Sequence, residues 1–184
     1  VAAVVAGAVR APAAAAACWA PPVEAPVTDP FRPPTCPYCA GNRGIEYGTR
    51  AGIAVRAVAA GRVTFAGAVA GTTYVVVEHA DGLRVTYGNL EQRRVGVGDA
   101  VVRGTVVGHT AGRFHLGLRR GDTYLDPAPF LGVWRGVVRL IPADGTPGAA
   151  THERRLVCPD ARVPAATAAG VRSSWSRGFA GRVR

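Results

Sequence analysis

The fold is decided by the stretch GRFHLGLRRGDTYLDP, residues 112–127. Apolar and polar residues alternate along it, as expected for a β-strand with one buried face. Phe114, Leu116 and Leu118 are predicted to share one face of this strand. The opposite face carries Arg113, His115 and Gly117. A Gly-Asp pair at 121–122 predicts a turn into a second short strand, which a proline at 127 ends. His115 looks buried in this strand, as either a metal ligand or an ordinary strand histidine.

Upstream of this stretch the sequence continues in the same pattern. Apolar or alternating runs predict strands at 53–57, 61–67, 74–79, 83–87 and 105–109. Hairpin turns are predicted at Ala60-Gly61 and at Asp81-Gly82. Edge strands are predicted at 27–31 and 137–141. Because the strands are short, joined by glycine turns and without helical periodicity, the predicted fold is all-β, an antiparallel sandwich or barrel.

The chain has 184 residues, enough for one domain with a core and tails. Its formal net charge of +10 comes from arginine, because the sequence contains no lysine. The lack of lysine excludes Schiff-base chemistry and lysine-attached cofactors. No nucleic-acid partner is expected, since no stacking aromatic residues accompany the arginines of the core.

The charge is concentrated toward the C-terminus. From Arg135 onward, nine arginines face three acidic residues, so this part carries a net charge of +6. We expect residues 143–184 to be mostly disordered. The basic tail is either a solvated segment or an attachment to an anionic polymer or membrane surface.

The N-terminal residues 1–17, VAAVVAGAVRAPAAAAA, are small and apolar and precede Cys18. They predict the remnant of a secretory signal peptide. A lipidated Cys18 is the second interpretation. No other stretch has the roughly 20 apolar residues that span a bilayer. A secreted or cell-envelope protein is therefore expected.

Four cysteines suit two disulfides in an oxidising compartment. The motif CPYC at 36–39 also matches a redox centre. Such centres begin a helix after a strand, whereas this motif lies in a proline-rich segment, residues 18–43. We predict a structural disulfide between Cys36 and Cys39, which leaves Cys18 and Cys158 as the second pair.

Several short motifs follow one another in a recognisable order. They are GNRGIE (41–46), VRA (55–57), GRV (61–63), HADGLR (79–84), YGNL (87–90), VGD (97–99), Gly104 and HLGLR (115–119). Their order and spacing resemble the LytM/lysostaphin-type zinc endopeptidases, which cut peptidoglycan cross-bridges. The resemblance covers about residues 27–132 and implies the barrel-sandwich hybrid fold of that family. The chain then divides into a signal-peptide remnant (1–17), a proline-rich extended segment with the CPYC loop (18–43), a LytM-like β domain (44–142) and the basic tail (143–184).

In that family a His-x-x-x-Asp pair and the second histidine of His-x-His hold the zinc ion. The matching positions here are Asn42, Glu46 and His115. The two histidines that act in catalysis correspond to Asn89 and Arg113. An amide oxygen is a poor zinc ligand, asparagine cannot shuttle a proton, and a guanidinium is always charged. The remaining candidate to replace a missing histidine is His109.

The resemblance implies a catalytically impaired LytM-like domain at the cell wall, with zinc bound weakly or not at all. Such a domain would bind peptidoglycan or a cell-wall hydrolase. Arg113 and Arg119 suit the carboxylates of stem peptides, and solvent-facing charge is the competing interpretation. The alternative function is an active zinc metalloendopeptidase that hydrolyses peptidoglycan cross-links. A lipoyl or biotinyl carrier domain, suggested by residues 95–104, is excluded because the required lysine is absent.

Overall fold

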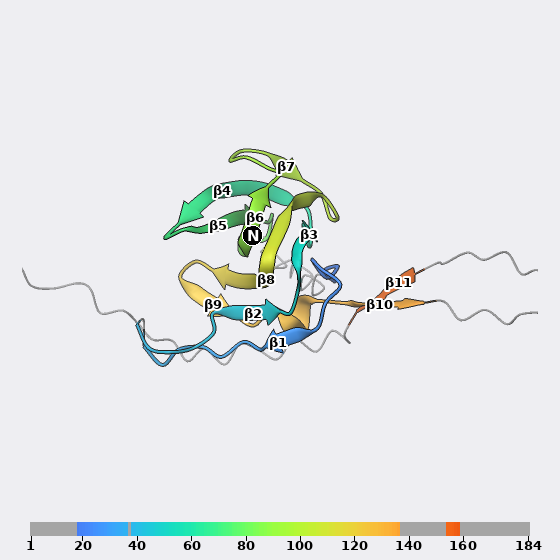
Figure 1. Ribbon diagram of the computed structural model, residues 1–184. Coiled ribbons are helices and arrows are strands. Elements are labelled where there is room, and N and C mark those ends of the chain that lie inside the picture. Colours follow the sequence, from blue (N-terminus) through green and yellow to red (C-terminus); the bar gives the residue numbers. More distant parts are fainter. Residues whose placement is uncertain (1–17, 37, 137–153, 159–184) are drawn as a thin grey trace, which may run out of the picture.

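The computed structural model describes residues 18–36, 38–136 and 154–158, which form antiparallel β-structure (Figure 1). The strands are β1 (Val27–Asp29), β2 (Gly44–Tyr47), β3 (Ala51–Arg56), β4 (Gly61–Val69), β5 (Thr72–Glu78), β6 (Leu83–Arg93), β7 (Ala100–Val101), β8 (Val106–Arg120), β9 (Thr123–Leu125), β10 (Val133–Gly136) and β11 (Arg154–Val157). A 3-10 turn, η1 (Ala128–Phe130), follows β9. The predicted all-β antiparallel fold is confirmed, and the described strands do not close into a barrel.

The 15-residue strand β8 is the centre of the sheet. β6 pairs along one of its edges. Three shorter strands follow one another along the other edge: β9 beside residues 118–120, β2 beside 114–117 and β3 beside 106–111. β8 therefore holds the stretch that decides the fold in the middle of the sheet (Figure 1).

β5, β4 and β7 extend the sheet beyond β6, and β1 closes the opposite end by pairing with β2. The edge strand predicted at 27–31 is thereby confirmed. The predicted hairpin between β5 and β6 also forms. Gly82 has a φ of +76°, and Asp81 Oδ1 accepts a hydrogen bond from Leu83 N at 3.1 Å. Both features are typical of Asp-Gly turns.

The core lies against the face of β8 that carries Phe114, Leu116 and Leu118, which is its inner face. Phe114, Leu116 and Leu118 are at most 1% exposed. The Phe114 ring lies 5.6 Å from the ring of Tyr47 and 6.5 Å from that of Tyr87. Burial raises the pKa of the Tyr87 hydroxyl well above its usual value, so this group stays neutral and accepts a hydrogen bond from Val58 N at 3.0 Å.

The predicted hairpin at Ala60-Gly61 is wrong. β3 pairs with β8, whereas β4 pairs with β5 and β7. In the connecting segment, Ala57 N donates to Thr105 O, and both Ala57 and Val58 are buried. The segment does not turn back on itself because its hydrogen bonds come from distant parts of the chain.

The two strands predicted at 105–109 and 113–118 are one continuous strand. A glycine between two apolar runs suggests a break in the strand. Gly112 instead has a φ of +126° within β8, and its carbonyl accepts a hydrogen bond from Thr49 Oγ1. Since glycine tolerates this φ, the strand continues through a local irregularity.

Residues 154–157, within the tail that the sequence predicts to be mostly disordered, form the strand β11. β11 pairs with β10, and the ribbon they form extends away from the main sheet (Figure 1). Cys158, directly after β11, is bonded to Cys18, and Cys36 is bonded to Cys39. These are the two pairs expected from the sequence.

Several other predictions lie outside the described residues. They concern the signal-peptide remnant at 1–17, the edge strand at 137–141 and the rest of the tail. Within the described ranges, no helix has the length and hydrophobicity needed to cross a membrane.

Candidate functional site

A glutamate–histidine pair lies at the centre of the candidate site. Glu46 on β2 and His115 on β8 are Cα partners, so their side chains leave the same face of the sheet. His115 Nδ1 lies 2.7 Å from Glu46 Oε1. Because an ionised carboxylate only accepts hydrogen bonds, this contact assigns the proton to Nδ1. A Cβ added at Gly44 would lie 2.7 Å from His115 Cε1, so the glycine leaves room for the ring.

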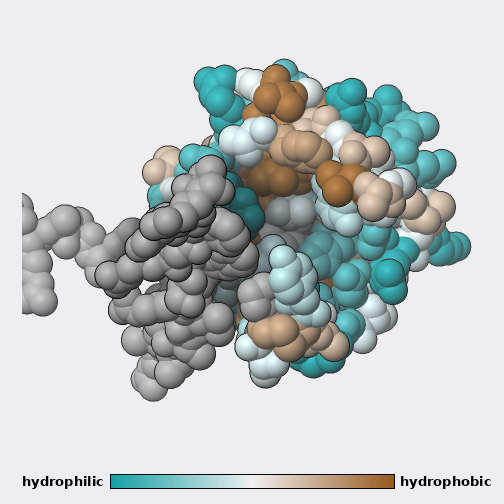
Figure 2. All heavy atoms as spheres, turned by 90° about the vertical axis from the view of Figure 1, so that its left-hand side faces the viewer, coloured by the Kyte–Doolittle hydropathy of each residue, from teal (hydrophilic) through white to brown (hydrophobic). Residues whose placement is uncertain are grey.

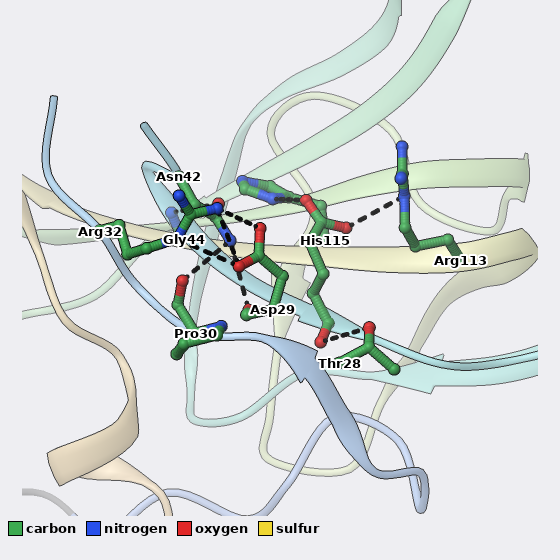
Figure 3. Close-up of polar contacts among 9 residues, drawn as sticks. Thr28, Asp29, Pro30, Arg32, Asn42, Gly44, Arg113 and His115 are labelled. Atoms are coloured by element: carbon green, nitrogen blue, oxygen red, sulfur yellow. Dashed lines mark hydrogen bonds and ion pairs between the residues drawn. The ribbon is translucent and has the colours of Figure 1, made fainter. Parts of the chain in front are cut away.

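Arg113 completes this cluster from the same strand. Its Nε lies 3.4 Å from Glu46 Oε2. The contact is an ion pair without a hydrogen bond, since Oε2 is buried and has no hydrogen-bond partner. The side chains of Glu46 and His115 are 16% and 20% exposed, whereas that of Arg113 is 70% exposed. One carboxylate is therefore shared between an imidazole and a guanidinium (Figure 3).

Asn42 lies near the cluster, but its side chain forms hydrogen bonds to backbone groups. Its Nδ2 donates to the carbonyls of Asp29 at 3.3 Å and Pro30 at 3.2 Å. Its Oδ1 accepts a hydrogen bond from Gly44 N at 3.2 Å. The residue is 7% exposed. Its amide thus ties the start of β2 to the segment after β1 (Figure 3).

The Asn42→Ala substitution is expected to lower the free energy of unfolding by about 1–3 kcal/mol, because it leaves one buried donor and two carbonyls without these partners. The measurement is urea denaturation with the disulfides intact. Gln92→Ala is the matched control, since Gln92 is exposed, and it should change the free energy by less than about 0.5 kcal/mol. Equal effects of the two substitutions would contradict this role of Asn42.

Asn89 lies beside the cluster without joining its hydrogen bonds. It follows Gly88, the Cα partner of His115, at an irregularity of β6. Its φ of +58° is a left-handed conformation that asparagine adopts more readily than most residues. Within the described part of the chain, its side chain forms no hydrogen bond.

His109 does not replace a missing histidine of the site. It is six residues before His115 on the same strand, which is about 20 Å away. Its Cα partners are Ala54 on β3 and Gln92 on β6. Another histidine, His79, is buried against Trp19 and contacts Ala60 O through Nδ1 at 2.7 Å. Neither histidine contacts the Glu46 carboxylate.

A hollow of about 430 Å³ lies over β4, β5, β6 and β8. It is on the outer face of the sheet, which is the face of β8 that carries His115 and Arg119. Arg119 lines it, together with residues that the sequence did not single out: Thr64, Phe65, Val69, Tyr74, Val76, Arg84 and Thr86. Viewed from the side where the β4–β5 turn lies, Figure 2 shows apolar side chains gathered around a hollow. The Asp81-Gly82 hairpin is a sequence signal that could have placed Arg84 beside Glu78. The pairing of β6 with β8, which places Arg84 opposite Arg119, has no local sequence signal.

Comparison with known proteins agrees with this fold. Residues 40–127 match the sequence profile of peptidase family M23. A search of curated proteins found no match. Helicobacter pylori Csd3 is similar at 22% identity with a TM-score of 0.55, over 62% of this chain and 35% of the Csd3 chain. The chain therefore matches about a third of the length of that protein.

Two further solved structures are similar over most of their own length. The catalytic domain of the antimicrobial peptidase lysostaphin from Staphylococcus simulans has 22% identity and a TM-score of 0.52, over 58% of this chain and 91% of that domain. A chain of the SpoIIQ–SpoIIIAH pore-forming complex has 22% identity and a TM-score of 0.54, over 63% of this chain and 92% of its own. At these identities the likeness shows the fold.

The M23 family is zinc-dependent, and a catalytic zinc site takes three protein ligands and an open position. The residues present here do not fit that ion. Asn42 Oδ1 already accepts a hydrogen bond, and Glu46 is shared with the Arg113 guanidinium, a cation that would repel a dication. Among the described residues, no group of three or more His, Cys, Asp or Glu side chains could hold a metal ion. The exposed part of Arg113 is suited instead to binding an anion.

Proposed function

We propose, on the premise that residues 40–127 form a domain of peptidase family M23, that this domain binds peptidoglycan at the bacterial cell wall without cleaving it. Members of the family are typically extracellular or cell-envelope proteins of bacteria. The domain would then keep the outer sheet face of a peptidase as a binding surface.

The observation that carries this proposal is the ion-pair cluster around Glu46. A working site of this family needs a carboxylate free to hold zinc and groups that move protons. Glu46 instead contacts His115 at 2.7 Å and Arg113 at 3.4 Å. The guanidinium of Arg113 cannot act as a general base because it does not lose its proton. These contacts support binding rather than hydrolysis.

The charge of the outer face supports an anionic ligand. Arg113 and Arg119 belong to the same face of β8, since alternate residues of a strand share a face. Guanidinium groups bind carboxylates with two parallel hydrogen bonds. Stem peptides of peptidoglycan carry such carboxylates, which makes them the favoured ligand of this face.

A protein ligand is the second candidate, in the form of a cell-wall hydrolase. The observation that favours it is the likeness to a chain of the SpoIIQ–SpoIIIAH pore-forming complex, in which the fold occurs with another protein. Binding of such a partner to this chain would also use an exposed face of the sheet.

The test is co-sedimentation of the purified chain with isolated peptidoglycan sacculi. The parent chain is expected to sediment with the sacculi and to release no soluble fragments. An Arg113→Ala, Arg119→Ala double variant should bind at least about tenfold more weakly, because each charge-assisted hydrogen bond contributes about 1.5–3 kcal/mol.

An Arg50→Ala, Arg120→Ala double variant is the matched control, because it loses the same charge from exposed residues. It should sediment as the parent does. Equal binding by both double variants would contradict the role of the outer face. Release of fragments that depends on His115 would favour the alternative of an active endopeptidase.

A further inference from the structure

We infer that the hollow beside the Glu46 cluster is a binding site for the C-terminal residue of a peptide, with Arg84 and Arg119 holding the carboxylate and apolar residues holding the side chain. The inference rests on the proposed function in one respect, which is that the peptide is a stem peptide of the cell wall. It specifies the chemical group that the outer face recognises.

Two arginines lie opposite each other on neighbouring strands at one wall of the hollow. Arg84 on β6 and Arg119 on β8 are Cα partners, which places their Cβ atoms about 4.5–5.5 Å apart on the same face. Like charges directly opposite each other in a sheet are destabilising. A bound anion between them would relieve that repulsion.

Only one of these two arginines is neutralised within the described part of the chain. Arg84 Nε lies 3.4 Å from Glu78 Oε2. Arg119 forms no hydrogen bond or ion pair with any described residue, although it is half-buried in the wall of the hollow. An unneutralised guanidinium beside a second one is the charge complement of a carboxylate.

The opposite wall of the hollow is apolar. Val76 lies on β5, the neighbour of β6, and Phe65 is its Cα partner on β4. Phe65 is 38% exposed. Successive strands are about 4.8 Å apart. On β6 the Cα partner of Val76 is Thr86, two residues from Arg84, so the apolar wall begins diagonally across from Arg84, about 7–8 Å away.

A glycine leaves room for one aromatic ring of the hollow, and a second ring lies at ordinary contact distance from another glycine. A Cβ added at Gly88 would lie 2.8 Å from Tyr74 Cε1, so the Tyr74 ring rests on the glycine backbone. A Cβ at Gly67 would lie 3.4 Å from Phe65 Cζ. The hollow is thus preformed by close packing of rings over backbone, which lowers the entropy cost of binding.

The spacing of the two walls favours a chain end over an internal acidic residue. The last residue of a peptide carries its carboxylate and its side chain on one Cα. The carboxylate can therefore contact the arginines while the side chain contacts the apolar wall. The volume of about 430 Å³ is within the roughly 300–1,000 Å³ of small-ligand pockets and suits one or two small residues.

The experiment is isothermal titration of the full chain with an N-acetylated tripeptide that ends in D-alanyl-D-alanine. The free acid is compared with the same tripeptide as a C-terminal amide. The parent chain should bind the acid at least about tenfold more tightly than the amide, since loss of the charge removes one or more charge-assisted hydrogen bonds.

Variants assign the effect to the hollow. Arg119→Ala and, separately, Arg84→Ala should each weaken binding of the acid at least about tenfold. Arg120→Ala removes a charge from the adjacent residue on the other face of β8 and should leave the affinity within about twofold. Circular dichroism shows which variants are folded, and either arginine variant suffices for the test.

Equal affinity for acid and amide, or unchanged binding by a folded Arg119→Ala or Arg84→Ala chain, would overturn the inference. A parent chain that sediments with sacculi but does not bind the free acid would also overturn it while leaving the proposed function intact. A chain that binds the acid through Arg119 without sedimenting would support the hollow as a peptide site and count against the wall role.

Discussion

Phe114→Ala is expected to lower the free energy of unfolding by about 3–5 kcal/mol. Phe114 is completely buried at the centre of the sheet, where its ring packs against Tyr47 and Tyr87. Removing the ring loses the transfer free energy of its atoms and leaves a cavity that three strands cannot easily close. The measurement is the urea midpoint and slope of the disulfide-intact chain.

Phe65→Ala is the matched control for Phe114→Ala, because it removes the same ring from a residue that is 38% exposed on the outer face. Its cost should be about 1 kcal/mol or less. The comparison also tests the register of β8, since a slip by one residue would exchange the two faces of that strand. Similar losses at the two positions would mean that the inner face has been misassigned.

The second large effect is expected from restoring the histidines and the aspartate of the family pattern. A variant with Asn42→His, Glu46→Asp and Arg113→His should gain about one equivalent of zinc and bind it at least about 100-fold more tightly than the parent. The substitutions remove the guanidinium beside the carboxylate and supply ligands of the type that zinc prefers. Zinc affinity is measured by competition with a chromogenic chelator.

Arg113→His alone is the control for this restoration. It removes the competing cation but leaves Asn42 with its three backbone contacts. It should therefore bind zinc much more weakly than the triple variant. If the folded triple variant gained no zinc, Asn42, Glu46 and His115 would not occupy the remnant of a metal site. Adding Asn89→His to the triple variant then tests whether peptidoglycan cleavage returns.

The sequence predicted the sheet well where its signals are local. Alternation along 112–118 assigned the two faces of β8, and Asp81-Gly82 located the hairpin between β5 and β6. The error at Ala60-Gly61 arose because that segment is fixed by Thr105 and Tyr87, which are far away in sequence. Hydrogen bonds over such separations have no local pattern.

The site was predicted in part for the same reason. The motifs led to Glu46, His115 and Arg113, and the structure brings these three together. The backbone contacts of Asn42 could not be foreseen, because their acceptors precede it by 12 and 13 residues and no local pattern predicts contacts at that separation. Arg84 was also missed, since its place opposite Arg119 depends on the register between β6 and β8.

The most direct measurement of the central claim is the zinc content of the unmodified chain. Protein purified without added metal, then loaded with zinc and dialysed, is analysed by mass spectrometry for the element. The occupied Glu46 carboxylate and the Arg113 guanidinium predict well under one equivalent after loading. A tightly held, stoichiometric zinc ion that is lost in His115→Ala would contradict the account and restore the endopeptidase as the favoured function.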